Sequence, residues 1–243
     1  MKRINLLTLF MMASLLVIGQ GSTIYRVNIL KPKPGMRDAF EASWKLHLNA
    51  YHQTTRKMRV NQITSGPNAG AYKLIEGPFS YADMDMPETN AKVHRTDLDK
   101  TIGPKTEQID NYYAYYRDSL SINTDTQAEK FLVSATVLKN GKMGDYLAEV
   151  SRGVKVQKKM NSTVSTIRSV RGFAGSKPTL ISVLRLKDGY KQLEGGPNNP
   201  EFRKNYIETY GQEAWDNRLK IMVDLVEDQS MHFEVLRADL SSK

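Results

Sequence analysis

Two stretches of similar pattern decide the fold: Ile24-Tyr25-Arg26-Val27-Asn28-Ile29-Leu30 and Phe131-Leu132-Val133-Ser134-Ala135-Thr136-Val137-Leu138. In the first, the side chains of Tyr25, Val27 and Ile29 alternate with those of Arg26, Asn28 and Leu30, which is the period of a half-buried strand. A glycine turn follows each stretch, at Gly35 and at Gly141, and a helical pattern begins directly after it. The repetition predicts two copies of one supersecondary plan, packed as a pseudo-symmetric pair.

Each copy continues in the same order. The first predicts a strand, a helix, two hairpin strands, a second helix and a closing strand at 24–30, 36–58, 60–64, 71–75, 88–100 and 111–117. The second predicts them at 131–138, 143–160, 167–170, 179–186, two helices from 200 and 213, and 231–236. This βαββαβ order is the ferredoxin-like plan, whose sheet leaves one face bare. We therefore expect an α+β protein of two tandem ferredoxin-like domains, 22–121 and 130–243, joined by the linker 122–129. The domains are expected to pack sheet to sheet as a pseudo-dimeric α/β barrel.

The N-terminus has the pattern of a secretory signal peptide. Lys2 and Arg3 precede an apolar run from Leu6 to Ile18, and small residues follow at Gly19 and Gly21. The run is too short to span a bilayer. We expect residues 1–21 to be cleaved, which leaves a secreted or periplasmic protein without a stable membrane span.

Composition limits the partners. Hydrophobic residues make up 40% and charged residues 25% of the chain, as in ordinary globular proteins, and cysteine is absent. The net charge of +9 favours a small or anionic ligand, although a solvated basic surface without a specific partner explains it as well. An exported address disfavours nucleic acid. The oligomeric state is not predicted.

A set of residues drawn from the first helix and from the hairpin after it gives the chain a resemblance to a known superfamily. They are Gly35, Phe40, Trp44, Gly66, Gly70, Tyr72 and Phe79. On these the chain resembles the dimeric α/β-barrel superfamily, and within it the NIPSNAP and antibiotic-biosynthesis-monooxygenase families. The resemblance implies a ligand site between the sheet and its covering helices, near the first helix. It also implies cofactor-free oxygenation of polycyclic phenols, or haem binding or degradation, as activities to consider.

Five residues are the candidates for ligand binding: Asn28, Trp44, His47, Tyr51 and Tyr72. Trp44, His47 and Tyr51 recur at spacings of three and four, which places them on one stripe of the first helix. The resemblance gives an Asn, a Trp and a His lining one cavity in haem-degrading members. A histidine on an apolar helix face is also explained as a packed core residue, and no catalytic residue is assigned.

The remaining histidines carry no metal motif. We expect His52 to be solvated at the edge of the first helix and His94 to lie on the surface of the second. Neither H-x-x-x-H nor H-E-x-x-H occurs, so the sequence predicts no metal site. It predicts no cofactor either.

Two functions remain. The missing catalytic motifs favour an exported, non-enzymatic protein that binds a ligand or partner of unknown specificity. The alternative is a cofactor-independent monooxygenase or haem-associated enzyme of the dimeric α/β-barrel type.

Overall fold

The computed structural model describes residues 23–54, 56–88, 90–124, 127–172, 177–194 and 199–243. The predicted signal peptide lies outside the described residues, and so do positions 125–126 of the predicted linker. Within the described part of the chain, no helix combines the length and apolar character that crossing a bilayer requires.

The described part of the chain contains eight strands and six α-helices, arranged in a similar order in each half. The first half contains β1 (Ile24–Pro32), α2 (Arg37–Tyr51), β2 (Met58–Ile63), β3 (Tyr72–Phe79), α3 (Tyr81–Asp85), α4 (Ala91–Asp97) and β4 (Thr106–Tyr116). The second contains β5 (Lys130–Leu138), α5 (Met143–Lys159), β6 (Thr166–Gly172), β7 (Thr179–Leu186), α6 (Pro200–Tyr210), α7 (Gln212–Asp224) and β8 (Val226–Leu236).

The strands form one closed barrel in the order β1-β3-β2-β8-β5-β7-β6-β4, and this is a mixed α/β fold. The predicted α/β barrel is present, but the two sheets that we expected to face each other are joined at their edges into one. Strand β2 pairs with β8 through Asn61 and Leu236, and β4 pairs with β6 through Tyr113 and Gly172. Closure gives every strand a neighbour on both sides, although the ladders that close the barrel, β2–β8 and β4–β6, are short.

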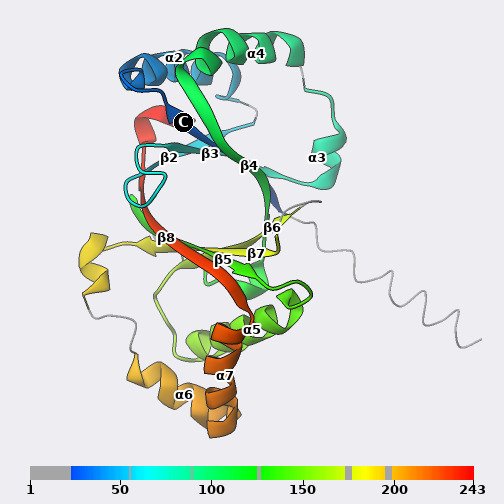
Figure 1. Cartoon of the computed structure of the whole chain (residues 1–243), viewed down its shortest axis with the longest axis vertical. Coiled ribbons are helices and arrows are strands. Elements are labelled where there is room, and N and C mark those ends of the chain that lie inside the picture. Colours follow the sequence, from blue (N-terminus) through cyan, green and yellow to red (C-terminus); the bar gives the residue numbers. More distant parts are fainter. Residues whose placement is uncertain (1–22, 55, 89, 125–126, 173–176, 195–198) are drawn as a thin grey trace, which may run out of the picture.

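The alternation in β1 decides what lies on each side of the barrel wall. Val27 and Ile29 point inward and pack with Phe131 and Val133 of β5 in the barrel core. The even-numbered side chains point outward, toward the helices. Helices α2 and α4 cover one side of the barrel, and α5, α6 and α7 cover the opposite side (Figure 1).

Each half is closed by the segment that ends the other half. After β4, Leu120 enters the apolar cluster beneath α5, and after β8, Leu240 enters the cluster beneath α2. Leu120 is 5% exposed and Leu240 is fully buried. The C-terminal segment therefore lies beside α2 and β2 of the first half, as Figure 1 shows.

Helix α2 is shorter than predicted. It ends at Tyr51 rather than near residue 58, because the chain turns at His52 and reverses through Arg56, whose φ of 51° is left-handed. Met58 already belongs to β2. This early turn brings His52 back toward the body of the protein.

Candidate active site

A cavity of about 660 Å³ lies between the outer face of the first-half strands and the helices α2 and α4. The outward side chains of β1, Arg26, Asn28 and Leu30, form its floor. Other lining residues come from α2, the turn after it, β3, α4 and β4, and they include Trp44, His47, His52, Leu74, His94, Ile102, Gln108 and Asn111. The cavity thus lies near the first helix, where the resemblance implied a ligand site.

Helix α2 contributes two side chains, Trp44 and His47, to the wall of the cavity. Trp44 is 1% exposed, and its indole Nε1 donates a hydrogen bond of 2.9 Å to the carbonyl of Leu240. His47, one turn further along, is 2% exposed, and its Nδ1 lies 2.6 Å from Oδ2 of Asp97. Both side chains are therefore held in place by groups distant in the sequence.

His52 is buried, contrary to the sequence prediction that it is solvated. It is 1% exposed, and its Nδ1 lies 2.8 Å from the carbonyl oxygen of Arg56. Because α2 stops at Tyr51, His52 leaves the helical path and its ring turns inward. Among the described residues, its Nε2 atom has no hydrogen-bond partner.

His94 is also buried, although the sequence predicted it on the surface. It is 6% exposed and its Nδ1 contacts the Glu88 carboxylate. Helix α4 has only seven residues, so its weak amphipathic pattern gave no signal for the face that packs against α2. The docking of α4 on α2, which sequence spacing cannot show, makes this histidine part of the site.

The three imidazole rings converge. Their inward nitrogens all lie within 4.8 Å of one another, and His47 Nε2 is 3.0 Å from His94 Nε2. The Tyr51 ring packs against both, with centroid distances of 4.9 Å to His47 and 4.8 Å to His94. We call His47, His52 and His94 the histidine cluster.

The partners of the cluster determine its protonation. Each Nδ1 faces an oxygen that can only accept: Asp97, Glu88 or the Arg56 carbonyl. The N–H is therefore assigned to Nδ1, and the Nε2 lone pairs face one another. Burial lowers the pKa of His47, and burial lowers the pKa of His52 to about 4, so these two rings are neutral near pH 7.

Carboxylates lie next to the histidine cluster and pair with nearby arginines. Glu88 also forms an ion pair of 3.1 Å with Arg56. Behind the cavity floor, the fully buried Glu76 carboxylate pairs with Arg26 and, at 3.8 Å, with Arg56. The Glu88 side chain also lines the cavity beside the histidines, whereas Asp97 and Glu76 do not.

The structure brings together four of the five predicted site residues. Asn28, Trp44 and His47 line the cavity, and Tyr51 packs against the cluster. Tyr72 is fully buried in the core beneath α2, against Phe40, and its hydroxyl contacts Glu41 and Arg37. It is not among the lining residues.

The second half has a smaller cavity in the corresponding place, of about 390 Å³. His47 is the eleventh residue of α2, and the eleventh residue of α5 is Gly153. A Cβ added at Gly153 would lie 3.5 Å from the Arg218 guanidinium, which pairs with Glu149 at 2.6 Å. An ion pair therefore stands near the position that a histidine has in the first half.

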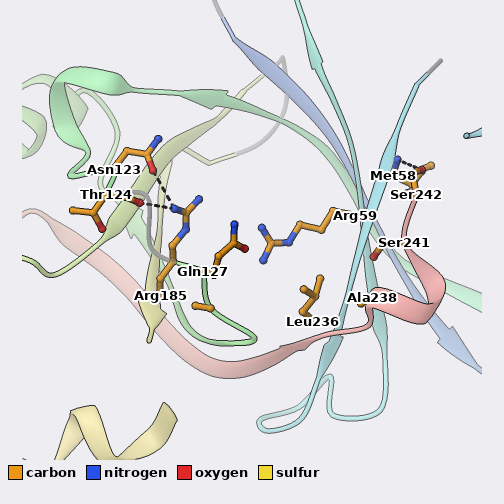
Figure 2. Close-up of a pocket in the computed structure, with 11 residues that line it drawn as sticks. Met58, Arg59, Asn123, Thr124, Gln127, Arg185, Leu236, Ala238, Ser241 and Ser242 are labelled. Atoms are coloured by element: carbon orange, nitrogen blue, oxygen red, sulfur yellow. Dashed lines mark hydrogen bonds between the residues drawn. The ribbon is translucent and has the colours of Figure 1, made fainter. Parts of the chain in front are cut away.

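A third pocket, of about 710 Å³, opens beside the end of the barrel (Figure 2). The guanidinium groups of Arg59 and Arg185 point toward one another across it, with Gln127 between them. Arg185 donates hydrogen bonds to Asn123 at 3.0 Å and to the Thr124 carbonyl at 3.1 Å. Residues 125–126, which adjoin this pocket in the chain, are outside the described part, so we build no site on it.

No family model and no curated protein matches the chain in sequence. Solved structures match over nearly the whole length. A "putative monooxygenase" from Lactobacillus acidophilus has a TM-score of 0.55 and 10% identity, covering 91% of this chain and 96% of that one. An anthrone oxidase-like protein has 0.56 and 9%, covering 90% and 92%. The chain therefore shares with these proteins its fold, a closed eight-stranded barrel with helices on the outside.

A chlorite dismutase from Candidatus Nitrospira defluvii, in complex with imidazole, matches with a TM-score of 0.55 and 6% identity, covering 93% and 96% of the two chains. At such identities the likeness shows the fold alone. The neighbours nevertheless correct our leading sequence hypothesis. A non-enzymatic binding protein was favoured because catalytic motifs were missing, whereas the structures that share this fold are described as oxidative enzymes and a dismutase.

Proposed function

We propose that the protein is an enzyme of the dimeric α/β-barrel type, an oxygenase or oxidase. Its substrate binds in the first-half cavity that the histidine cluster lines, which we call the histidine cavity. The observation that carries this proposal is the buried histidine cluster at the wall of a cavity of about 660 Å³. A concave, partly apolar site with a few convergent polar groups is the usual form of a small-molecule site. The descriptions of the fold neighbours favour oxidative chemistry within that general class.

The lining indicates the type of substrate. Leu30, Leu74 and Ile102 supply apolar surface, while the Asn28 and Asn111 amides supply hydrogen bonds. A small aromatic molecule with one or two hydroxyl or carbonyl groups suits this combination. With no cation on the histidine cluster, the Nε2 atom of His52, which has no hydrogen-bond partner among the described residues, can accept the proton of such a hydroxyl, provided the substrate brings it within hydrogen-bond reach.

The histidine geometry does not fit haem. A haem iron takes the nitrogen of an axial histidine and needs a flat space in front of it for the macrocycle. His47 Nε2 instead faces His94 Nε2 at 3.0 Å, which leaves no room for a porphyrin plane between the two rings. We therefore assign no step to haem.

The two halves are proposed to derive from a tandem duplication of one ferredoxin-like unit. Gly35 and Gly141 have nearly equal φ values, 75° and 73°, and each lies two residues before the first residue of its helix. The strand pairing supports the idea, since β1 lies between β3 and β4 as β5 lies between β7 and β8. In this view the first unit has the histidine cavity and the second completes the barrel. Export of the protein stays a prediction from residues 1–21.

Oxygen uptake tests the proposed function. Purified protein is given a panel of anthrones, quinols and simple phenols in an oxygen electrode. Asn28→Leu, which fills the cavity floor, should abolish turnover of whichever substrate is active. Ser134→Leu, on the outward face of β5 in the second-half cavity, is the matched control and should leave it unchanged. Equal loss in both variants, or no uptake with any substrate, would contradict the proposal.

A further inference from the structure

We propose that His47, His52 and His94 bind one divalent first-row transition metal ion through their Nε2 atoms. Imidazole nitrogen is a preferred ligand of Zn²⁺, Cu²⁺, Fe²⁺ and Ni²⁺. The site lies in the cavity of the proposed enzyme, but its existence does not depend on which reaction takes place there.

The first argument is the unfavourable contact inside the cluster. With both Nδ1 atoms donating to carboxylates, the Nε2 atoms of His47 and His94 face each other as two acceptors at 3.0 Å. Two lone pairs at that distance repel each other, so the contact needs either a second proton on one ring, which makes it an N–H···N hydrogen bond, or a metal ion. A metal ion bound by both nitrogens removes the conflict.

The second argument is the unpartnered nitrogen of His52. Its ring is 1% exposed, and Nε2 has no hydrogen-bond partner among the described residues. A buried polar atom without a partner costs about 1–3 kcal/mol, so such atoms are rare unless a ligand or water satisfies them. One ring nitrogen of His52 lies within 4.8 Å of a ring nitrogen of each of the other two histidines, and Nδ1 is already paired with the Arg56 carbonyl, which leaves Nε2 as the ligand atom.

The third argument is the orientation of the rings. A metal-binding histidine usually donates its other ring N–H to a carboxylate or a backbone carbonyl, which fixes the ring. All three members of the cluster do this, with Asp97, Glu88 and the Arg56 carbonyl as acceptors. The two carboxylates also offset the charge that a cation would bring into a buried site.

The distances require a small adjustment. Metal–nitrogen bonds of 2.0–2.1 Å place tetrahedral ligand atoms about 3.3 Å apart. The closest pair is at 3.0 Å and the widest separation is within 4.8 Å, so the rings must shift by about an ångström. Three protein ligands leave a fourth position, and a ligand there would come from the cavity, which is the arrangement of catalytic rather than structural metal sites.

Metal titration tests the inference. The protein is purified without a histidine tag, stripped with a chelator, and titrated with Zn²⁺ by calorimetry and with Co²⁺ by visible absorption. We expect one ion per chain and Co²⁺ bands of a nitrogen-rich, low-coordinate site. His47→Gln, His52→Gln and His94→Gln should each weaken binding by about 100-fold or more, and Asp97→Asn by about 10–100-fold.

His232 is the fourth histidine of the chain and provides the control. It pairs with Glu234 on β8 and takes no part in the cluster. His232→Gln should bind the metal as the wild type does. Circular dichroism shows whether each variant is folded, and a rise in melting temperature on adding Zn²⁺ should occur for wild type and His232→Gln alone.

The outcomes separate this inference from the proposed function. No binding, or binding unchanged in all three cluster variants, overturns the metal site. If the protein consumes oxygen with a substrate but binds neither Zn²⁺ nor Co²⁺, the proposed function holds and the metal site fails. If the metal binds as predicted and no substrate is oxidised, the metal site holds and the proposed function fails.

Discussion

The indole Nε1 of Trp44 donates a hydrogen bond of 2.9 Å to the carbonyl oxygen of Leu240, across 196 positions of the chain. Trp44 forms part of the cavity wall, and Leu240 belongs to the last turn of the protein. The contact therefore fixes a site residue with the segment that completes the barrel. The histidine cavity depends on the second half of the chain even though its lining comes from the first.

Trp44→Phe should lower the free energy of unfolding by about 1–3 kcal/mol, because it leaves the buried Leu240 carbonyl without its donor. Urea denaturation followed by circular dichroism measures the change. Trp215 is a half-buried residue of α7, and Trp215→Phe serves as the control for removing an indole. It should lower the free energy of unfolding by less than Trp44→Phe does. An equal or larger loss in the control would show that the hydrogen bond is not the reason.

Leu240→Ala and Leu120→Ala should each cost about 2–5 kcal/mol, since both remove a buried side chain from a cluster in the opposite half. Because each half is completed by the other, both variants should still unfold in a single transition. Circular dichroism and tyrosine fluorescence should give coincident curves. Two separate transitions would show that the halves fold independently.

The strand pattern could be predicted from the sequence because it depends on neighbours two residues apart. The inward positions of Val27 and Ile29 and the outward position of Asn28 follow directly from the alternation. The capping box of α3 is likewise local, since Ser80 and Asp83 are only three residues apart. These features are local in the chain.

The histidine cluster could not be predicted in this way. His47 and His94 belong to two helices whose relative position depends on packing against the barrel, and the position of His52 depends on where α2 ends. The sequence predicted a barrel but not the strand pairs that close it, because the β2–β8 pairing joins residues more than 170 positions apart. Such contacts leave no spacing that a single sequence can show.

The pH dependence of stability should include a contribution from Glu41. Two hydrogen bonds from Arg237, at 2.7 and 2.8 Å, lower the pKa of Glu41 from 4.5 to about 2. A lowered folded-state pKa stabilises the protein above the unfolded value, and the contribution is lost as the pH falls from 4.5 toward 2. Glu41→Gln should therefore destabilise at pH 7, by about 1–3 kcal/mol, and much less near pH 2.5.

Urea unfolding at a series of pH values measures this difference. Glu213→Gln, on the exposed start of α7, controls for the loss of a carboxylate. A gap between wild type and Glu41→Gln that stays constant from pH 7 to pH 2.5 would contradict the assignment.

Haemin should not bind to the histidine cluster, because the 3.0 Å contact between His47 and His94 leaves no space for the macrocycle. Absorption spectra of haemin with the protein should show no Soret shift that depends on His47. His232→Gln controls for histidines elsewhere. A Soret shift that is lost in His47→Ala and kept in His232→Gln would refute the argument and restore the haem alternative.

A buried ion pair inside the barrel provides the last prediction. Lys73 Nζ lies 2.9 Å from Glu234 Oε1, and the side chains of Lys73 and Glu234 are 5% and 0% exposed. Burial alone would raise the pKa of Glu234, but Lys73 and hydrogen bonds from His232 and Asn61 hold it at about 2. The pair is therefore charged at neutral pH.

Glu234→Gln should cost about 3–5 kcal/mol, because it leaves the Lys73 ammonium buried and unpaired. Adding Lys73→Met should recover much of that loss, since the double variant buries no charge at that point. Glu227→Gln, which breaks the exposed pair with Lys177, is the matched control and should change stability by about 0–1 kcal/mol. If the double variant is less stable than Glu234→Gln alone, the unpaired charge is not the main cost, and the hydrogen bonds from Asn61 and His232 must hold this part of the barrel together instead.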